Sequence, residues 1–323
     1  MTSSAATALK ARLRLPAIAA PMFLVSGPEL VQAVRRAGLM ASLPFPNART
    51  IDVLEDWLKD LCARTPDAPR APFAANMLTH SSYGRFDAEL DLVRRFQPEI
   101  VITALGGPRR VVDAVHSYGG LVFADVNSVT FAKKAVDQGA DGLVLVSAGA
   151  GGHTGPMAGF AFVPAVRQFF DGPVVLGGGI GDGRAIRAAE ILGADLAYMG
   201  TRFIAAEESR ASDEYRSMLV AAEFEDLVLS NKLTGADAYY LKASLSRMGL
   251  DPDGRRSDGP DFTDSEGQVK AWRDVWSAGH GVGAVTRVQT AAQIIDTLAA
   301  EYEAACTTPR HIVEDTARLV GVN

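Results

Sequence analysis

A glycine-rich segment carries the histidine that is best placed for acid–base chemistry. His153 lies in SAGAGGHTGP, directly after a short apolar run, with Gly149, Gly151, Gly152 and Gly155 around it. An imidazole titrates near neutral pH, so this side chain could act as a general base or acid. The glycines predict a flexible, uncrowded loop. A lone loop histidine is more often solvated or structural, so spacing alone leaves both roles open.

Two further glycine loops have the composition of phosphate sites. GGGIGDGR places Gly178 and Gly179 just before a predicted helix, and MGTRF places Gly200 and Thr201 before another. Backbone N–H groups without side chains at a helix N-terminus attract phosphate through unpaired donors and the helix dipole. Either loop alone could be only a tight turn. The two together favour a phosphate-bearing ligand.

The elements that must position these residues form a repeating pattern. Eight short apolar runs alternate with stretches of helical spacing, and they begin at Leu15, Leu39, Phe73, Ile100, Gly120, Gly142, Pro173 and Asp195. Continuous apolar runs are typical of parallel strands that are buried on both faces. Eight strand–helix units in series predict an α/β fold, a (β/α)₈ TIM barrel, with an open doubly wound sheet as the alternative.

The carboxyl ends of the predicted strands indicate the type of chemistry. They carry Pro21 and Met22 after the first strand, Asn76 in the third and Asp125 in the fifth. No lysine falls at a strand end, the five histidines form no metal-binding pair, and Asp125 is the only acid at this rim. A Schiff-base or metal site is therefore poorly supported. We expect no metal, and chemistry borrowed from an organic cofactor.

The pattern changes after the eighth strand, which divides the chain into four parts. Residues 1–14 are predicted to be a disordered leader, and residues 15–207 are predicted to form the barrel. Residues 208–289 are predicted to form a helical lid or subdomain, which a Pro/Gly/Asp-rich loop interrupts. Residues 290–323 are predicted to form a C-terminal helical tail that packs on the barrel.

Composition excludes several classes of function. The chain has 323 residues, a net charge of −6 and 48% hydrophobic residues, which suits a globular protein and not a nucleic-acid binder. No apolar run is long enough to cross a bilayer, so no membrane partner is expected. The two cysteines are too few for a disulfide framework, and a cytoplasmic location is expected.

Six motifs together resemble the nitronate monooxygenase (2-nitropropane dioxygenase-like) family. They are AAPMFLVSGPEL, FAAN, SAGAGGHTGP, GGGIGDGR, GADLAYMGTRFIAAEES and WSAGHGVG, in order from about Leu15 to Tyr302. The resemblance implies an FMN-dependent oxidoreductase that oxidises alkyl nitronates or nitroalkanes with O₂. By position it implies that His153 is the catalytic base and that FMN is bound by Pro21, Met22, Asn76, Asp125, Gly178, Gly179, Gly200 and Thr201.

One residue departs from the family pattern, and rival functions stay open. Some relatives carry a lysine near the flavin where this chain has Asp125. An alternative on the same scaffold is an NAD(P)H-dependent FMN reductase of quinones or enoyl thioesters. A cofactor-free isomerase or lyase is a more distant alternative. The expected partners are a small molecule, O₂ and, in the reductase, NAD(P)H, with a homodimer as the candidate assembly.

Overall fold

Eight parallel strands close into a barrel. The structure, a computed structural model, describes residues 4–63, 71–251 and 274–308. The strands pair in the order β1-β2-β3-β4-β5-β6-β8-β9, and β1 pairs with both β2 and β9. The predicted TIM barrel is confirmed, and its closure excludes the open sheet. The barrel strands are β1 (Ala17–Ala19), β2 (Met40–Pro44), β3 (Phe73–Leu78), β4 (Ile100–Ala104), β5 (Leu121–Val126), β6 (Gly142–Val146), β8 (Val174–Gly177) and β9 (Leu196–Met199).

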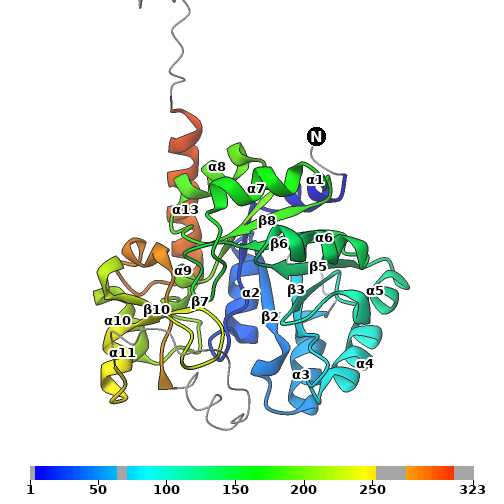
Figure 1. Ribbon diagram of the computed structural model, residues 1–323, viewed down its shortest axis with the longest axis horizontal. Helices are drawn as coiled ribbons and strands as arrows, with labels where there is room; N and C mark the ends of the chain where they lie inside the picture. The colour runs from blue at the N-terminus through cyan, green and yellow to red at the C-terminus, as the bar shows by residue number, and fades with distance from the viewer. Residues whose placement is uncertain (1–3, 64–70, 252–273, 309–323) are drawn as a thin grey trace, which may run out of the picture.

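Helices connect successive strands and cover the outside of the barrel (Figure 1). Each coincides to within a few residues with a predicted helical stretch. Thr50, Ser128 and Asp182 cap three of them by accepting a hydrogen bond from a backbone N–H three residues later. The helices are α2 (Pro28–Arg36), α3 (Ile51–Leu61), α4 (Phe86–Phe96), α5 (Arg109–His116), α6 (Val129–Asp137), α7 (Gly159–Arg167) and α8 (Gly183–Leu192).

The barrel interior is apolar through most of its depth and polar at the carboxyl end. Buried side chains from all eight strands fill it, namely Ile18, Met40, Ala74, Ile100, Ile102, Phe123, Val144, Val175 and Leu196. Side chains two residues apart on a strand face the same side. The position two residues beyond Met40, Ala74, Phe123 and Leu196 is a polar residue each time: Ser42, Asn76, Asp125 and Tyr198.

The amino-terminal end of the barrel is covered by a helix, so the prediction of a disordered leader over residues 1–14 is wrong for the part that the structure describes. Helix α1 (Ser4–Lys10) buries Ala6 and Leu9. Leu9 belongs to the same apolar cluster as the barrel interior. The Ser- and Ala-rich composition suggested disorder, but two apolar residues at helical spacing are enough to dock this segment.

The segment after the barrel contains strands as well as helices, unlike the helical subdomain predicted for residues 208–289. Strands β10 and β11 form a hairpin, and β11 also pairs with β7 (Gly152–His153) of the loop after β6. Residues 252–273 of this segment lie outside the described ranges. The described elements lie together at one side of the barrel (Figure 1) and are α9 (Thr201–Ile204), α10 (Asp213–Ala221), β10 (Leu227–Ser230), β11 (Ala238–Leu241) and α11 (Lys242–Arg247).

Helix α13 (Ala291–Cys306) runs beside the barrel and packs against α8 and α2 (Figure 1). The Glu301 carboxylate accepts a hydrogen bond from the Gly183 N–H at 2.9 Å, where α8 begins. A negative charge at this position also interacts favourably with the helix dipole. Within the described residues, no helix is long and apolar enough to span a membrane.

The close contact between α13 and α8 makes Gly183 a test of the packing. A Cβ at Gly183 would overlap the backbone of Leu298 and Tyr302, which cannot rotate away. We expect Gly183→Ala to lower the free energy of unfolding by about 1–3 kcal/mol, measured by urea denaturation. Gly84→Ala is the control, because a Cβ there meets nothing within 4 Å. Equal effects of the two variants would contradict this view of the α8–α13 contact.

Candidate active site

Asn76, Asp125 and Tyr198 form a polar layer at the carboxyl end of the barrel interior. They come from β3, β5 and β9, on different sides of the barrel. Asn76 is buried, and its Nδ2 donates a hydrogen bond to the Ile102 carbonyl oxygen at 3.3 Å. In (β/α)₈ enzymes this end of the barrel holds the active site. The layer therefore forms the floor of the candidate site.

Asp125 and Tyr198 carry enclosed polar atoms. Asp125 Oδ1 is inaccessible and has no hydrogen-bond partner, whereas the Tyr198 hydroxyl, which is equally inaccessible, interacts with the Ser42 side chain. Burial raises the pKa of Asp125 to about 7. Burial and the nearby Asp125 carboxyl raise the pKa of Tyr198 well above its ordinary value. Two weakly acidic groups at the floor of a barrel are suited to binding a polar ligand.

His153 is held in a sheet, so the prediction of a flexible, uncrowded loop is wrong. It belongs to β7, where it pairs with Ala238 of β11. The next residue, Thr154, donates its N–H to the Asp237 carbonyl oxygen at 3.0 Å and its hydroxyl to that of Ser147 at 3.0 Å. Burial lowers the pKa of His153 below 6.5. The imidazole is therefore neutral at pH 7, the form that can accept a proton.

The glycines before His153 allow close packing between backbones. A Cβ at Gly151 would lie 2.7 Å from the Gly279 nitrogen, and one at Gly149 would lie 2.7 Å from the His280 ring. The His280 N–H donates to the Gly149 carbonyl oxygen at 2.9 Å. The SAGHGVG segment thus lies directly against the loop after β6, with Gly281 against Gly181 in the same manner.

Gly178 and Gly179 lie after β8 in conformations that favour glycine, with φ of +122° and +70°. A Cβ at Gly178 would overlap Ser147 of the neighbouring loop, whereas one at Gly179 would have only the His280 Cβ nearby, at 3.9 Å. The start of α8 itself is already occupied by the carboxylates of Asp182 and Glu301. An anion would therefore have to bind at the glycine loop, short of the helix.

Gly200 and Thr201 follow β9 on the adjacent side of the barrel. A Cβ at Gly200 would lie 3.6 Å from the Met22 Cγ, so the loops after β9 and β1 are in contact. The Thr201 hydroxyl accepts a hydrogen bond from the Gly279 N–H at 2.9 Å. The residues predicted in the loops after β1, β6, β8 and β9 therefore gather at one end of the barrel, beside the floor that contains Asn76 and Asp125.

Asn47, which the sequence reasoning missed, holds the loop that carries Pro21 and Met22. Its buried amide accepts from the Leu24 N–H at 2.8 Å and donates to the carbonyl oxygens of Met22 and Ser26 at 2.9 and 2.8 Å. Leu24 has a φ of +61°, a strained value for a leucine, and three hydrogen bonds from one side chain keep it there. Asn47 follows a prolyl-rich turn that resembles an ordinary loop, so no local signal marks it.

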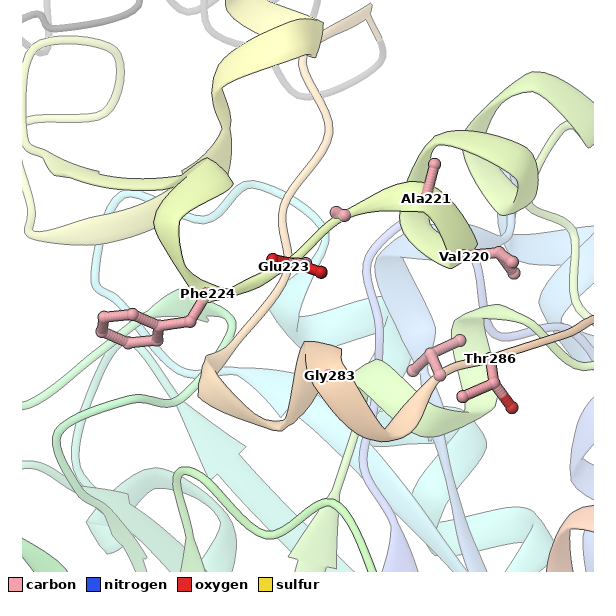
Figure 2. A pocket seen from close by; sticks show the side chains of 8 residues that line it. Val220, Ala221, Glu223, Phe224, Gly283 and Thr286 are labelled. Carbon is pink, nitrogen blue, oxygen red and sulfur yellow. The ribbon is translucent and has the colours of Figure 1, made fainter.

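An aromatic cluster at the edge of the site was also missed. The His280 ring makes edge-to-face contacts with Tyr239 and Phe224, at centroid distances of 4.6 and 4.8 Å. Phe224 lines a pocket of about 460 Å³. Figure 2 shows this pocket between the end of α10 and the segment that contains Gly283 and Thr286. These residues come from three distant parts of the chain, so only the fold brings them together.

Comparisons with known proteins define the family. A family model described as nitronate monooxygenase matches residues 68–252, more than half of the chain, and the chain therefore belongs to the nitronate monooxygenase family. The predicted family is confirmed. A nitronate monooxygenase of Paraburkholderia phytofirmans is 27% identical over 73% of this chain and 76% of its own length. The family is one of oxidoreductases.

The chain is also similar to a second curated relative and to two solved structures. A hydroxy-methyl-oxo-octahydroindene-carboxyl-CoA dehydrogenase of Rhodococcus jostii is 30% identical over 71% of this chain, and the match spans 63% of that relative. Nitroalkane oxidase of Streptomyces ansochromogenes superimposes with a TM-score of 0.78 at 26% identity, covering 93% of this chain and 99% of its own. FabK of Thermotoga maritima has a TM-score of 0.77 at 23% identity, covering 95% and 98%, and shares the fold.

The raised pKa of Asp125 predicts how stability depends on pH. A folded-state pKa of about 7 means that the folded protein keeps a proton that the unfolded chain releases near pH 4. Stability is therefore lost as the pH rises from about 4 to 7, by up to about 4 kcal/mol. We expect Asp125→Asn to be more stable than wild type at pH 8 and similar to it at pH 4, by thermal denaturation. The same difference at both pH values would contradict the raised pKa.

Proposed function

We propose that the chain is an FMN-dependent oxidoreductase that oxidises alkyl nitronates, or the nitroalkanes that form them, with His153 as the base and O₂ as the electron acceptor. One observation carries the proposal. A neutral histidine and a glycine loop suited to an anion lie at the same end of a closed barrel, in a chain that belongs to the nitronate monooxygenase family.

The glycine loops fit the phosphate of FMN. A Cβ at Gly179 would have only the His280 Cβ nearby, at 3.9 Å, and one at Gly200 would meet no atom closer than 3.6 Å, so both glycines leave room for a ligand. Gly178 is packed against Ser147 and shapes the loop beside them. These loops follow β8 and β9, the seventh and eighth strands of the barrel, where such barrels commonly hold phosphate. Thr201 would support the site from beneath, because its hydroxyl is fixed by Gly279.

The floor and the loop after β1 fit the flavin ring. Asp125 offers a carboxyl oxygen without a partner, Tyr198 offers a buried hydroxyl, and Asn76 adds an amide. Pro21 and Met22 would contribute apolar contact from a loop that Asn47 makes rigid. FMN, when bound, would accept two electrons from the substrate and deliver them to O₂.

His153 would remove the proton from the carbon next to the nitro group. Burial keeps its imidazole neutral, and pairing of β7 with β11 fixes its backbone. A positioned base of this kind typically contributes a factor of about 10²–10⁴ to the rate. With a preformed nitronate, this proton is already absent, and the histidine would act only on the later steps.

A second candidate function is a reductase or dehydrogenase of thioesters, which would use NAD(P)H on the same scaffold. The Rhodococcus relative is named for a CoA ester. The mouth of the barrel presents the exposed apolar side chains Phe23, Leu24 and Leu105, which suit a larger apolar substrate than a small nitroalkane. The pocket beside Phe224 offers further room.

Anaerobic bleaching of the flavin separates the two functions. Purified protein loaded with FMN would be mixed, without oxygen, with an alkyl nitronate or with NADH or NADPH, and the flavin absorbance followed. We expect bleaching by the nitronate. Bleaching by the nicotinamide alone would instead favour the reductase and direct the search to quinones and enoyl thioesters. A folded protein that binds no FMN would overturn both.

The phosphate assignment can be tested at Gly179. Asn and Asp tolerate positive φ better than other non-glycine residues, and a Cβ there meets no atom closer than 3.9 Å, so the two variants carry the same backbone strain and nearly the same shape. Only Asp adds a charge that repels phosphate. We expect Gly179→Asp to weaken FMN binding at least about a hundredfold relative to Gly179→Asn, measured by flavin fluorescence. Equal affinities of the two variants would argue against phosphate at this loop.

The role of His153 predicts both a variant phenotype and a pH profile. We expect His153→Ala to bind FMN normally but to lose turnover of neutral nitroalkanes by about 10²–10⁴-fold. In the wild type, kcat/KM should fall when the pH drops below the pKa of His153, because the base is then protonated. Burial lowers this pKa, so the fall should begin at a lower pH than for an ordinary histidine. His116→Ala is the control, since that histidine lies at the end of α5, outside the site, where its ring is hydrogen-bonded to the Asp141 carboxylate. Unchanged turnover in His153→Ala would refute its role as the base.

A further inference from the structure

A buried carboxyl oxygen in the floor of the site lacks a hydrogen-bond partner. Asp125 Oδ1 is enclosed without a hydrogen bond, and the Tyr198 hydroxyl is enclosed with only the Ser42 side chain beside it. Leaving such a group unpaired is costly, so a native protein that does so calls for an explanation, and a bound ligand that supplies the partner is one. Asp125 and Tyr198 each retain some accessible surface as whole residues at this end of the barrel. They sit two positions beyond Phe123 and Leu196, which seal the barrel below.

The surroundings determine the protonation state of this pair. The neighbours in the same layer, Ser42 and Asn76, carry no charge. Tyr198 is the titratable group that the structure couples to Asp125, and burial is the cause that shifts the carboxyl. Because no cation acts on it in the described structure, the carboxyl favours its neutral form, which donates a hydrogen bond. The phenol of Tyr198 is protonated and donates as well.

We propose that Asp125 and Tyr198 bind the polar edge of the flavin ring as a pair of neutral hydrogen-bond donors, so that FMN binding requires a proton on Asp125. This inference rests on the proposed function, because it takes FMN as the ligand. In such a site the group beside the flavin ring is a neutral acid that becomes negative on ionisation, and not a positively charged side chain. Bound FMN stabilises the protonated carboxyl, and ionisation of Asp125 replaces a donor with a negative charge that faces the acceptor atoms of the ring.

The dissociation constant of FMN measured between pH 7 and 9 tests this proposal. The fluorescence of FMN is quenched when it binds. Fluorescence titrations of the apoprotein with FMN therefore give the dissociation constant at each pH. In the wild type we expect affinity to fall with rising pH, by up to about tenfold per pH unit once Asp125 ionises. The phosphate of FMN is already ionised throughout this range, since its second pKa is about 6.

Three variants identify the titrating group. Asp125→Asn keeps a donor that cannot ionise, so its affinity should stay constant from pH 7 to 9. Tyr198→Phe should bind FMN several-fold more weakly at pH 7, because one donor is lost, but retain the slope. His153→Ala should also retain the wild-type slope, which separates Asp125 from the histidine.

The outcomes distinguish failure of this inference from failure of the proposed function. FMN binding that is independent of pH in the wild type, or a slope that persists in Asp125→Asn, would overturn the inference and leave FMN as the cofactor. A folded wild-type protein that binds no FMN at any pH would overturn the proposed function itself. If a variant fails to fold, as circular dichroism would reveal, the wild-type titration still tests the inference, because an affinity that does not change between pH 7 and 9 overturns it.

Discussion

The closure of eight strands around a filled interior is the constraint on which the rest of the molecule depends. All eight strands contribute side chains to the layers that fill the barrel, and those side chains are apolar from Ile18 on β1 to Leu196 on β9. Only the layer nearest the carboxyl ends is released from this demand, because loops and not further strands cover it. Ser42, Asn76, Asp125 and Tyr198 occupy this layer. Polar side chains in the barrel interior are therefore confined to the layer that forms the floor of the candidate site.

Contacts between glycine backbones then connect the barrel to the part of the chain that follows it. Gly279 lies so close to Gly149 and Gly151 that a Cβ would come within 2.5–2.6 Å of their backbone, and Gly281 lies against Gly181, where a Cβ would come within 3.1 Å. The same segment fixes the Thr201 hydroxyl and brings the His280 ring between Tyr239 and Phe224. The walls of the candidate site therefore come from sequence regions more than a hundred residues apart, although its floor comes from the barrel alone.

The sequence predicted the barrel well because continuous apolar runs and helical periodicity are local signals, and all eight strands and the connecting helices fall where these signals lie. Position at strand ends likewise predicted that Asn76, Asp125 and the glycine loops would gather at one rim. The sequence did not reveal that α1 docks on the barrel or that β7 and β11 hold His153, because both depend on contacts between distant segments. Asn47 was missed for the same reason, since its three partners belong to another loop.

The packing of SAGHGVG and α13 against the loops after β6 and β8 has a consequence for the order of assembly during translation. The eight strands are complete once Met199 has been synthesised, but the residues that support those loops lie between Gly279 and Glu301. A nascent chain can therefore close its barrel while the loops that would hold a cofactor still lack their support. Under the proposed function, the flavin would therefore be acquired only after α13 has emerged from the ribosome, and not by a chain that has just completed its barrel.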